Sequence, residues 1–121
     1  INQYDSFLFN KIGNQLIHYP PNKREKTYTI PSGVKTIQNF AFYECNSLIL
    51  IILPDSVTIM GKFAFYRCSS LTSITLSGSL TTIGKFAFYR CNSLISITTC
   101  TNSSAFEVYN LLCQILDLSQ Q

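Results

Sequence analysis

The sequence has little of what catalysis and membrane insertion require. His18 is the only histidine, and no neighbouring residue supports a Cys-His or Ser-His catalytic pair that would use it. No apolar stretch reaches the ~18 residues of a membrane span, and the run at residues 48–53 fits a short buried strand. The sequence therefore predicts no reaction centre and no membrane span within this chain.

Charge is also scarce, because charged residues make up 12% of the chain, about half the usual share. With 46% apolar residues the chain can form a continuous core and is not disordered. The net charge is only +3, and the one basic cluster, residues 23–26, fits a solvated loop better than a nucleic-acid patch. The acidic residues are scattered, and phosphate-binding loops and zinc-ligand spacings are missing. We expect no enzyme, metal, cofactor or nucleic-acid partner.

What the chain does have is repetition. Residues 40–48 read Phe-Ala-Phe-Tyr-Glu-Cys-Asn-Ser-Leu, and near-copies follow at residues 63–71 and 86–94. The offset is 23 residues both times, without insertion. A fixed period of this length indicates a solenoid, in which each copy forms one turn and buries its apolar side against the next.

Each unit combines a strand pattern with a helical pattern. Leu71, Ile74 and Leu76 have the spacing of a strand that points alternate side chains into the core. Spacings of three and four then indicate a short helix with an inward-facing stripe. The members of this stripe in the third unit are Ile83, Phe86, Ala87 and Cys91. We therefore predict an α/β repeat solenoid, a right-handed coil with parallel strands on its concave face and short helices on its convex face.

Large rings recur in every unit at Phe42, Phe65 and Phe88. We expect these rings to lie in register and to stack between neighbouring layers, and we expect this stacking to be a main source of stability.

The two ends depart from the period, within what we interpret as a single domain over residues 1–121 and a fragment of a longer array. Before the repeats, residues 4–20 read as a β-hairpin with Gly13 in its turn. After them comes a degenerate strand and then a capping box with Ser104 as N-cap and Glu107 three residues later. The predicted units are repeats 25–47, 48–70 and 71–93, the degenerate strand 94–103 and the helix 104–118. This helix is expected to cap the core, and docking against a further domain or chain is the alternative.

Three of the five cysteines, Cys45, Cys68 and Cys91, occupy one position of the repeat. Their side chains should point in parallel into the core, so we interpret them as buried thiols that fill space. Cys100 and Cys113 lie outside this row and could pair in an oxidising compartment, although an odd total leaves at least one thiol free.

The strand alternation predicts which side chains face outward on the concave sheet. In the third unit these are Ser73, Thr75 and Ser77, and steps of 23 residues give the equivalents. The predicted partner-binding residues are Thr27, Thr29, Leu50, Ile52, Ser73, Thr75, Ser96 and Thr98. The face is mostly hydroxyl-bearing, and its apolar spot at Leu50 and Ile52 is either a contact site or chance drift within a repeat.

The convex ridge repeats a tyrosine at positions 43, 66 and 89, each followed by a charged residue. We interpret the ridge as packing between turns, with each tyrosine on its neighbour and Glu44 paired with Arg67. The alternative is a binding surface, because Tyr and Arg are enriched at interface hot spots.

Residues 4–99 resemble the BspA-type leucine-rich repeats, also called the treponema-pallidum-type class. The resemblance rests on a strand motif ending in proline, an Ile-Gly pair, an Ala-Phe pair and a cysteine, recurring in register. In the third unit the matching residues are Leu71, Ile74, Leu76, Ile83, Gly84, Ala87, Phe88 and Cys91. The N-terminal segment also resembles a hairpin of this family that precedes a Tyr-x-Ile-Pro strand, here residues 28–31. Ser77 in place of proline, Gln38 in place of glycine and the polar Thr99 depart from the pattern.

This resemblance implies a non-enzymatic surface or secreted protein of bacteria or parasitic protists. It further implies binding of a protein partner, such as a host extracellular-matrix or cell-surface protein, through the concave sheet. The alternative is a structural spacer that presents another domain and binds nothing itself. The sequence leaves the oligomeric state open.

Overall fold

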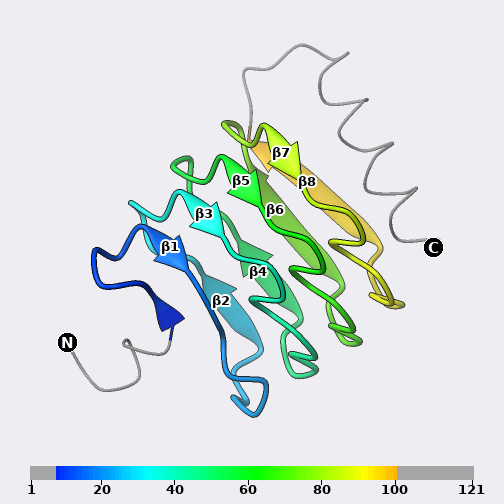
Figure 1. Ribbon diagram of the computed structural model, residues 1–121. Coiled ribbons are helices and arrows are strands. Elements are labelled where there is room, and N and C mark those ends of the chain that lie inside the picture. Colours follow the sequence, from blue (N-terminus) through cyan, green and yellow to red (C-terminus); the bar gives the residue numbers. More distant parts are fainter. Residues whose placement is uncertain (1–7, 101–121) are drawn as a thin grey trace.

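Each repeat forms one coil with three sides, and the coils stack into a parallel-strand solenoid (Figure 1). This computed structural model describes residues 8–100. One side is a short sheet in the order β1 (Gln15–Leu16), β3 (Thr36–Ile37), β5 (Ile59–Met60), β7 (Thr82–Ile83). A second side is a longer sheet in the order β2 (Thr27–Thr29), β4 (Leu50–Ile52), β6 (Ser73–Ser77), β8 (Ser96–Cys100). The third, here called the turn side, comprises residues 38–48, 61–71 and 84–94 and contains no strand. The predicted repeat solenoid is confirmed.

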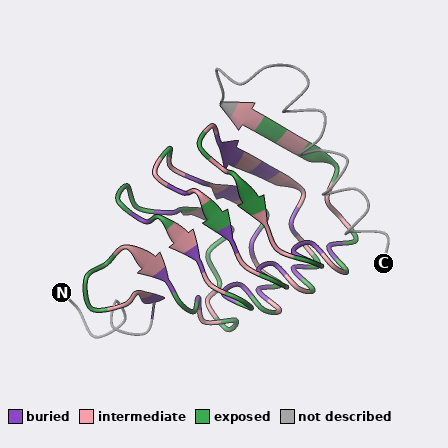
Figure 2. Cartoon of the chain, turned by 45° about the horizontal axis from the view of Figure 1, so that its top comes forward, coloured by how far each residue is buried: buried purple, intermediate pink, exposed green. Residues whose placement is uncertain are grey.

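The core runs along the axis of the solenoid, between the three sides (Figure 2). Leu71, Ile74 and Leu76 are fully buried, as the strand spacing predicts. Pairing of β4 with β6 places Ile51 beside Ile74, and the same pairing repeats in the next coil. Equivalent residues therefore stack on one another along the whole array.

A stack of aromatic rings forms the centre of this core. Phe42, Phe65 and Phe88 are fully buried, and adjacent ring centroids lie 4.8 and 5.3 Å apart with nearly parallel planes. Tyr19 extends the stack at its N-terminal end, 5.3 Å from Phe42. The predicted register of the three phenylalanines is confirmed.

The helices predicted on the convex face are wrong for the described residues, because the turn side contains only turns. Phe40 and Glu44 both have positive φ, 61° and 53°, and their equivalents in the next two coils do too. A left-handed residue at every fourth position interrupts an α-helix, at a cost of about 1–2 kcal/mol each. The three-and-four spacing arises from successive tight turns and not from a continuous helix.

Hydrogen bonds on the turn side alternate between the coil itself and the next coil. Ala41 and Tyr43 donate to carbonyls three residues earlier, as in a turn. Phe42 donates across to the carbonyl of Ala64 at 2.7 Å, and Phe65 donates to that of Ala87 at 2.8 Å. The turn side therefore joins neighbouring coils by backbone hydrogen bonds, much as a sheet does. The amides of Phe42 and Phe65 have their acceptors in the next coil, whereas in a helix they would bond within their own coil.

This geometry also corrects the predicted inward stripe. Ala87 and Cys91 are buried, but Phe86 and Ile83 are only half-buried. Phe88 fills the core in place of Phe86, because the turns direct the second phenylalanine of each Phe-Ala-Phe triplet inward. The first phenylalanines form an outer stack with centroids 5.0 and 5.1 Å apart, and Phe40 at its end is 46% exposed.

In the segment predicted as a hairpin, an antiparallel bridge joins Phe9 to Leu16, and Gly13 has a φ of 86° in the turn between them. The same segment also enters the solenoid, because β1 pairs in parallel with β3. Gln15 pairs with Thr36, 21 residues later, whereas the other coils keep the 23-residue offset. The first coil is thus two residues shorter at this point. For this reason, comparing residues at a fixed offset of 23 does not reveal it as a repeat. The predicted helix 104–118 lies outside the described residues.

Two glycines are required by the close approach of the coils. A Cβ on Gly61 would lie 2.5 Å from the backbone nitrogen of Asn39, and one on Gly84 would collide with the backbone of Lys62. One coil before Gly61 the equivalent position is Gln38, whose side-chain amide donates a hydrogen bond to the side-chain oxygen of Gln15 at 2.8 Å.

Replacing Phe65 with Ala should lower the free energy of unfolding by roughly 3–5 kcal/mol, since a fully buried ring leaves a cavity in the central stack. Phe63→Ala in the same coil is the matched control and should cost about half as much, because Phe63 is only half-buried. Urea denaturation of both variants measures these losses. Equal losses of unfolding free energy would show that Phe65, in the inner stack, contributes no more to stability than Phe63 in the outer one.

Gly61→Ala should destabilise the protein by about 2 kcal/mol or more, because the contacted atoms belong to backbone that cannot move aside. Gln38→Ala, at the same position one coil earlier, should cost under about 1 kcal/mol through loss of one part-buried hydrogen bond. Thermal unfolding followed by circular dichroism compares the two. A stable Gly61→Ala variant would contradict the close packing of these coils.

Candidate functional site

The eight predicted partner-binding residues lie in two rows across the outer face of the long sheet. The first row is Thr27, Leu50, Ser73 and Ser96, and the second is Thr29, Ile52, Thr75 and Thr98. Residues at the two ends of the rows are exposed or nearly so, and those of β4 and β6 are half-buried by their neighbours. The strand register therefore brings all eight onto one surface.

The two rows contain hydroxyl groups and two aliphatic side chains but no charged residue. Hydroxyl groups both donate and accept hydrogen bonds, so the face can pair with the polar groups of a partner. Leu50 and Ile52 sit together in the same strand and supply apolar contact area. This surface suits recognition and has no group suited to acid–base chemistry.

Ser77 does not belong to this face, although the alternation predicts that it points outward. It is buried at 3% exposure, and its Oγ donates to the carbonyl of Val57 at 2.6 Å. Leu76 and Ser77 are both buried, so the alternation of inward and outward side chains breaks at Ser77, although β6 and its pairing with β8 continue through this residue. The first two repeats have Pro31 and Pro54 at this position. A short polar side chain at this point satisfies a buried carbonyl of the preceding coil.

Sequence reasoning missed two exposed isoleucines next to the rows. Ile49 directly precedes β4 and is 37% exposed, and Ile95 directly precedes β8 and is 86% exposed. Leu48 and Leu94, the residues directly before them, already occupy the core position of the repeat. Ile49 and Ile95 could therefore have been recognised from the sequence as surface residues. Together with Leu50 and Ile52 they increase the apolar area near the long sheet.

The cysteine row is buried as predicted, and its thiols also make hydrogen bonds. Cys68 Sγ donates to the carbonyl of Phe42 at 3.0 Å, and Cys91 Sγ donates to that of Phe65 at 2.9 Å. All three thiols of the row are free. The thiol of Cys45 beside it, together with burial, raises the pKa of Cys68, and the Cys68 thiol together with burial raises the pKa of Cys91. Thiols held protonated in a closed core are unreactive.

Metal-ligating side chains are not clustered in residues 8–100. No group of three or more His, Cys, Asp or Glu side chains in this part of the chain is arranged to hold a metal ion. His18 is exposed on the segment after β1. No helix in the described range is long and apolar enough to cross a membrane.

The tyrosines of the turn side stack between coils as predicted. Centroids of Tyr43 and Tyr66 lie 5.3 Å apart, and those of Tyr66 and Tyr89 lie 5.7 Å apart. Arg67 and Glu44 also pair as predicted, with Nη1 and Oε1 at 3.4 Å.

The 23-residue coils, the stacked phenylalanines and the buried cysteine row together characterise this repeat. The model of the BspA-type leucine-rich repeat region matches residues 10–117 with six copies. The chain belongs to the BspA-type leucine-rich repeat family. Leucine-rich repeats are generally protein-interaction modules, and both the family and the fold are typically non-enzymatic.

Solved structures of other leucine-rich repeat proteins are similar to this BspA-type chain. A leucine-rich repeat protein from Eubacterium ventriosum is 32% identical with a TM-score of 0.73, and the match covers 78% of this chain. The chain spans only 25% of the length of that protein. A leucine rich cell surface protein of Faecalibacterium prausnitzii is 22% identical with a TM-score of 0.41, over 88% of this chain and 38% of that one. The leucine-rich repeat protein of T. pallidum is 14% identical with a TM-score of 0.43, over 94% and 96%. A comparison with curated proteins found no significant relative.

Because the pKa values of Cys68 and Cys91 are raised, we expect the free energy of unfolding to decrease as the pH rises through the alkaline range. A thiol whose folded pKa exceeds its unfolded value of about 8.5 contributes its full stability below that pH. Above it the unfolded chain loses the proton first, so the free energy of unfolding should fall by up to about 1.4 kcal/mol per pH unit and thiol. Tyr19, whose pKa burial and the nearby Glu25 raise to about 12, adds to this decline only above pH ~10.

Urea titrations between pH 7 and 10 measure this slope in the unaltered protein and in the Cys68→Ala, Cys91→Ala double variant. The variant should be less stable at pH 7 but should show a shallower decline above pH 8.5. Identical slopes in the two proteins would mean that these thiols are not held protonated by the fold.

Proposed function

We propose that this BspA-type repeat segment binds a protein partner through the outer face of the long sheet. The observation that carries the proposal is the registered pair of rows, in which eight side chains of four neighbouring strands share one uncharged surface. Hydroxyl groups at regular spacing and an apolar spot at Leu50 and Ile52 can pair with an extended or flat partner surface. Interfaces of this kind depend on a few central apolar contacts surrounded by polar ones.

We further propose that the partner is a host extracellular-matrix or cell-surface protein and that the whole protein is displayed on a cell surface or secreted. This part of the proposal is supported by the family to which the chain belongs, whose members are associated with adhesion. The spacer role is the competing function. A spacer needs stable stacked coils but no particular side chains on the long sheet, so substitutions in the two rows separate the two functions.

The test is binding to a panel of immobilised extracellular-matrix proteins by surface plasmon resonance. Leu50→Asp combined with Thr75→Lys should weaken binding at least tenfold, because a charge would be desolvated at the centre of the face. Ile59→Asp combined with Thr82→Lys is the matched control, because it introduces the same two charges at exposed register partners of the short sheet. The control should bind like the unaltered protein.

Circular dichroism spectra of both double variants establish that they fold. Binding that survives Leu50→Asp with Thr75→Lys would exclude the long sheet as the contact surface. Absence of binding to every protein of the panel, with the fold intact, would favour the spacer.

A further inference from the structure

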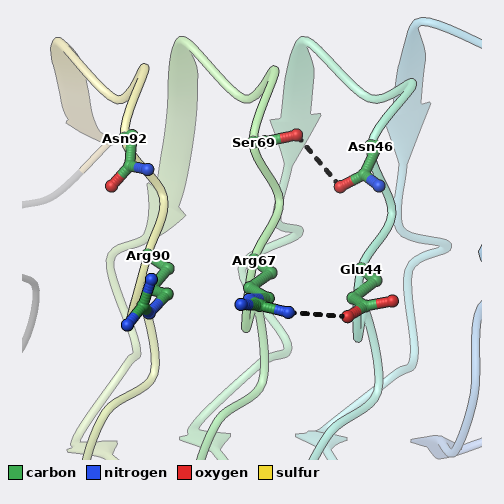
Figure 3. A pocket seen from close by; sticks show the side chains of 6 residues that line it. All are labelled: Glu44, Asn46, Arg67, Ser69, Arg90 and Asn92. Atoms are coloured by element: carbon green, nitrogen blue, oxygen red, sulfur yellow. Dashed lines mark hydrogen bonds and ion pairs between the residues drawn. The ribbon is translucent and has the colours of Figure 1, made fainter.

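The turn side contains a polar groove that the proposed function does not use. It is a shallow, open depression of about 290 Å³ that spans three coils (Figure 3). Its six lining residues are Glu44, Asn46, Arg67, Ser69, Arg90 and Asn92. These residues form two rows of three, since each row repeats one position of the 23-residue unit.

The charge in this groove is uneven along the solenoid. Glu44 is at one end, and its carboxylate lies 3.4 Å from one nitrogen of Arg67. Both side chains of this pair are well exposed, at 36% and 48%, so the pair is weak and exchangeable. Arg90 is at the other end and forms an ion pair with no carboxylate of residues 8–100. Two guanidinium groups therefore face one carboxylate, and the positive charge is concentrated toward Arg90.

Each guanidinium group lies over a tyrosine ring of the same ridge. The guanidinium carbon of Arg67 lies 5.7 Å from the ring centroid of Tyr66, and that of Arg90 lies 5.5 Å from Tyr89. The tyrosines are themselves fixed by stacking between coils. A guanidinium group that is already oriented loses less conformational freedom when it binds an anion.

The amide groups beside the arginines add further donors. Ser69 Oγ donates to the side-chain oxygen of Asn46 at 3.0 Å, which leaves the amide N–H groups of Asn46 unpaired within the described part of the chain. Asn92 has the same position one repeat beyond Ser69. Arg90 and the amide groups thus have no matching acceptor among the described residues, and a carboxylate is the group that arginine binds with two parallel hydrogen bonds.

We propose that this groove binds an acidic peptide segment of a protein partner, with a carboxylate side chain on Arg90 and Asn92 and a second one near Arg67. A polyanion such as a sulfated polysaccharide binds through many charges along an extended basic surface. Here only two arginines are available and Glu44 opposes them, so one or two carboxylates fit the groove better than a long row of sulfates. The site lies on a different side of the coil from the long sheet and is independent of it.

The experiment titrates the chain with a hexaglutamate peptide in low-salt buffer and follows binding by isothermal calorimetry. Arg90→Gln should weaken binding about fivefold or more, since it removes a charge-assisted pair. Glu44→Gln should strengthen binding about twofold to fivefold, because it removes the opposing carboxylate and frees Arg67. A gain of affinity in one variant and a loss in the other cannot both result from misfolding.

Arg24→Gln is the matched control, because it removes the same charge at an exposed position outside the groove. It should change the affinity less than twofold. The proposal is overturned if hexaglutamate does not bind, if Arg24→Gln weakens binding as much as Arg90→Gln, or if Glu44→Gln fails to strengthen it. Tighter binding of heparin than of hexaglutamate at equal ionic strength, lost in Arg90→Gln, would also overturn it by assigning the groove to a sulfated polysaccharide.

Discussion

The fold depends on hydrogen bonding between neighbouring coils on all three of their sides. Strand pairing supplies these bonds on the two sheets, and on the turn side the amides of Phe42 and Phe65 supply them by donating to the next coil. Because the backbone of each coil is paired with the same positions of its neighbours, equivalent residues must stack. The constant offset between the later coils, the aromatic stack and the need for glycine at Gly61 all follow from this single constraint.

The same constraint determines what kind of surface the protein can present. A side chain that points outward is repeated about every 5 Å along the solenoid, so each face consists of rows whose chemistry is set by small differences between repeats. On the long sheet the rows keep hydroxyl groups and change to leucine and isoleucine in β4. On the turn side one row changes from Glu44 to Arg67 and Arg90, which creates a charge gradient along the solenoid. Differences in surface chemistry along the solenoid therefore arise at the positions where the repeat varies.

The sequence predicts the coil and its core well, because period and apolar spacing directly reflect stacking. Leu71, Ile74, Phe88 and the cysteine row are buried as expected. The helices and the inward position of Phe86 are wrong, because tight turns with left-handed residues share the three-and-four spacing of a helix and only backbone angles separate them. The outward position predicted for Ser77 is also wrong, because regular alternation gives no sign that two successive strand residues, Leu76 and Ser77, are both buried. The groove requires contacts between coils that no single repeat shows, whereas the two rows of the long sheet follow from alternation alone.

The most direct test of this account is a measurement of scalar couplings across hydrogen bonds in protein labelled with ¹⁵N and ¹³C. We expect couplings from the amide nitrogen of Phe65 to the carbonyl carbon of Ala87, and from the amide nitrogen of Phe42 to the carbonyl carbon of Ala64. Both connect one coil to the next. A coupling from Phe65 to the carbonyl of Gly61, four residues earlier in the chain, would show a helix on this side of the coil and would contradict the account.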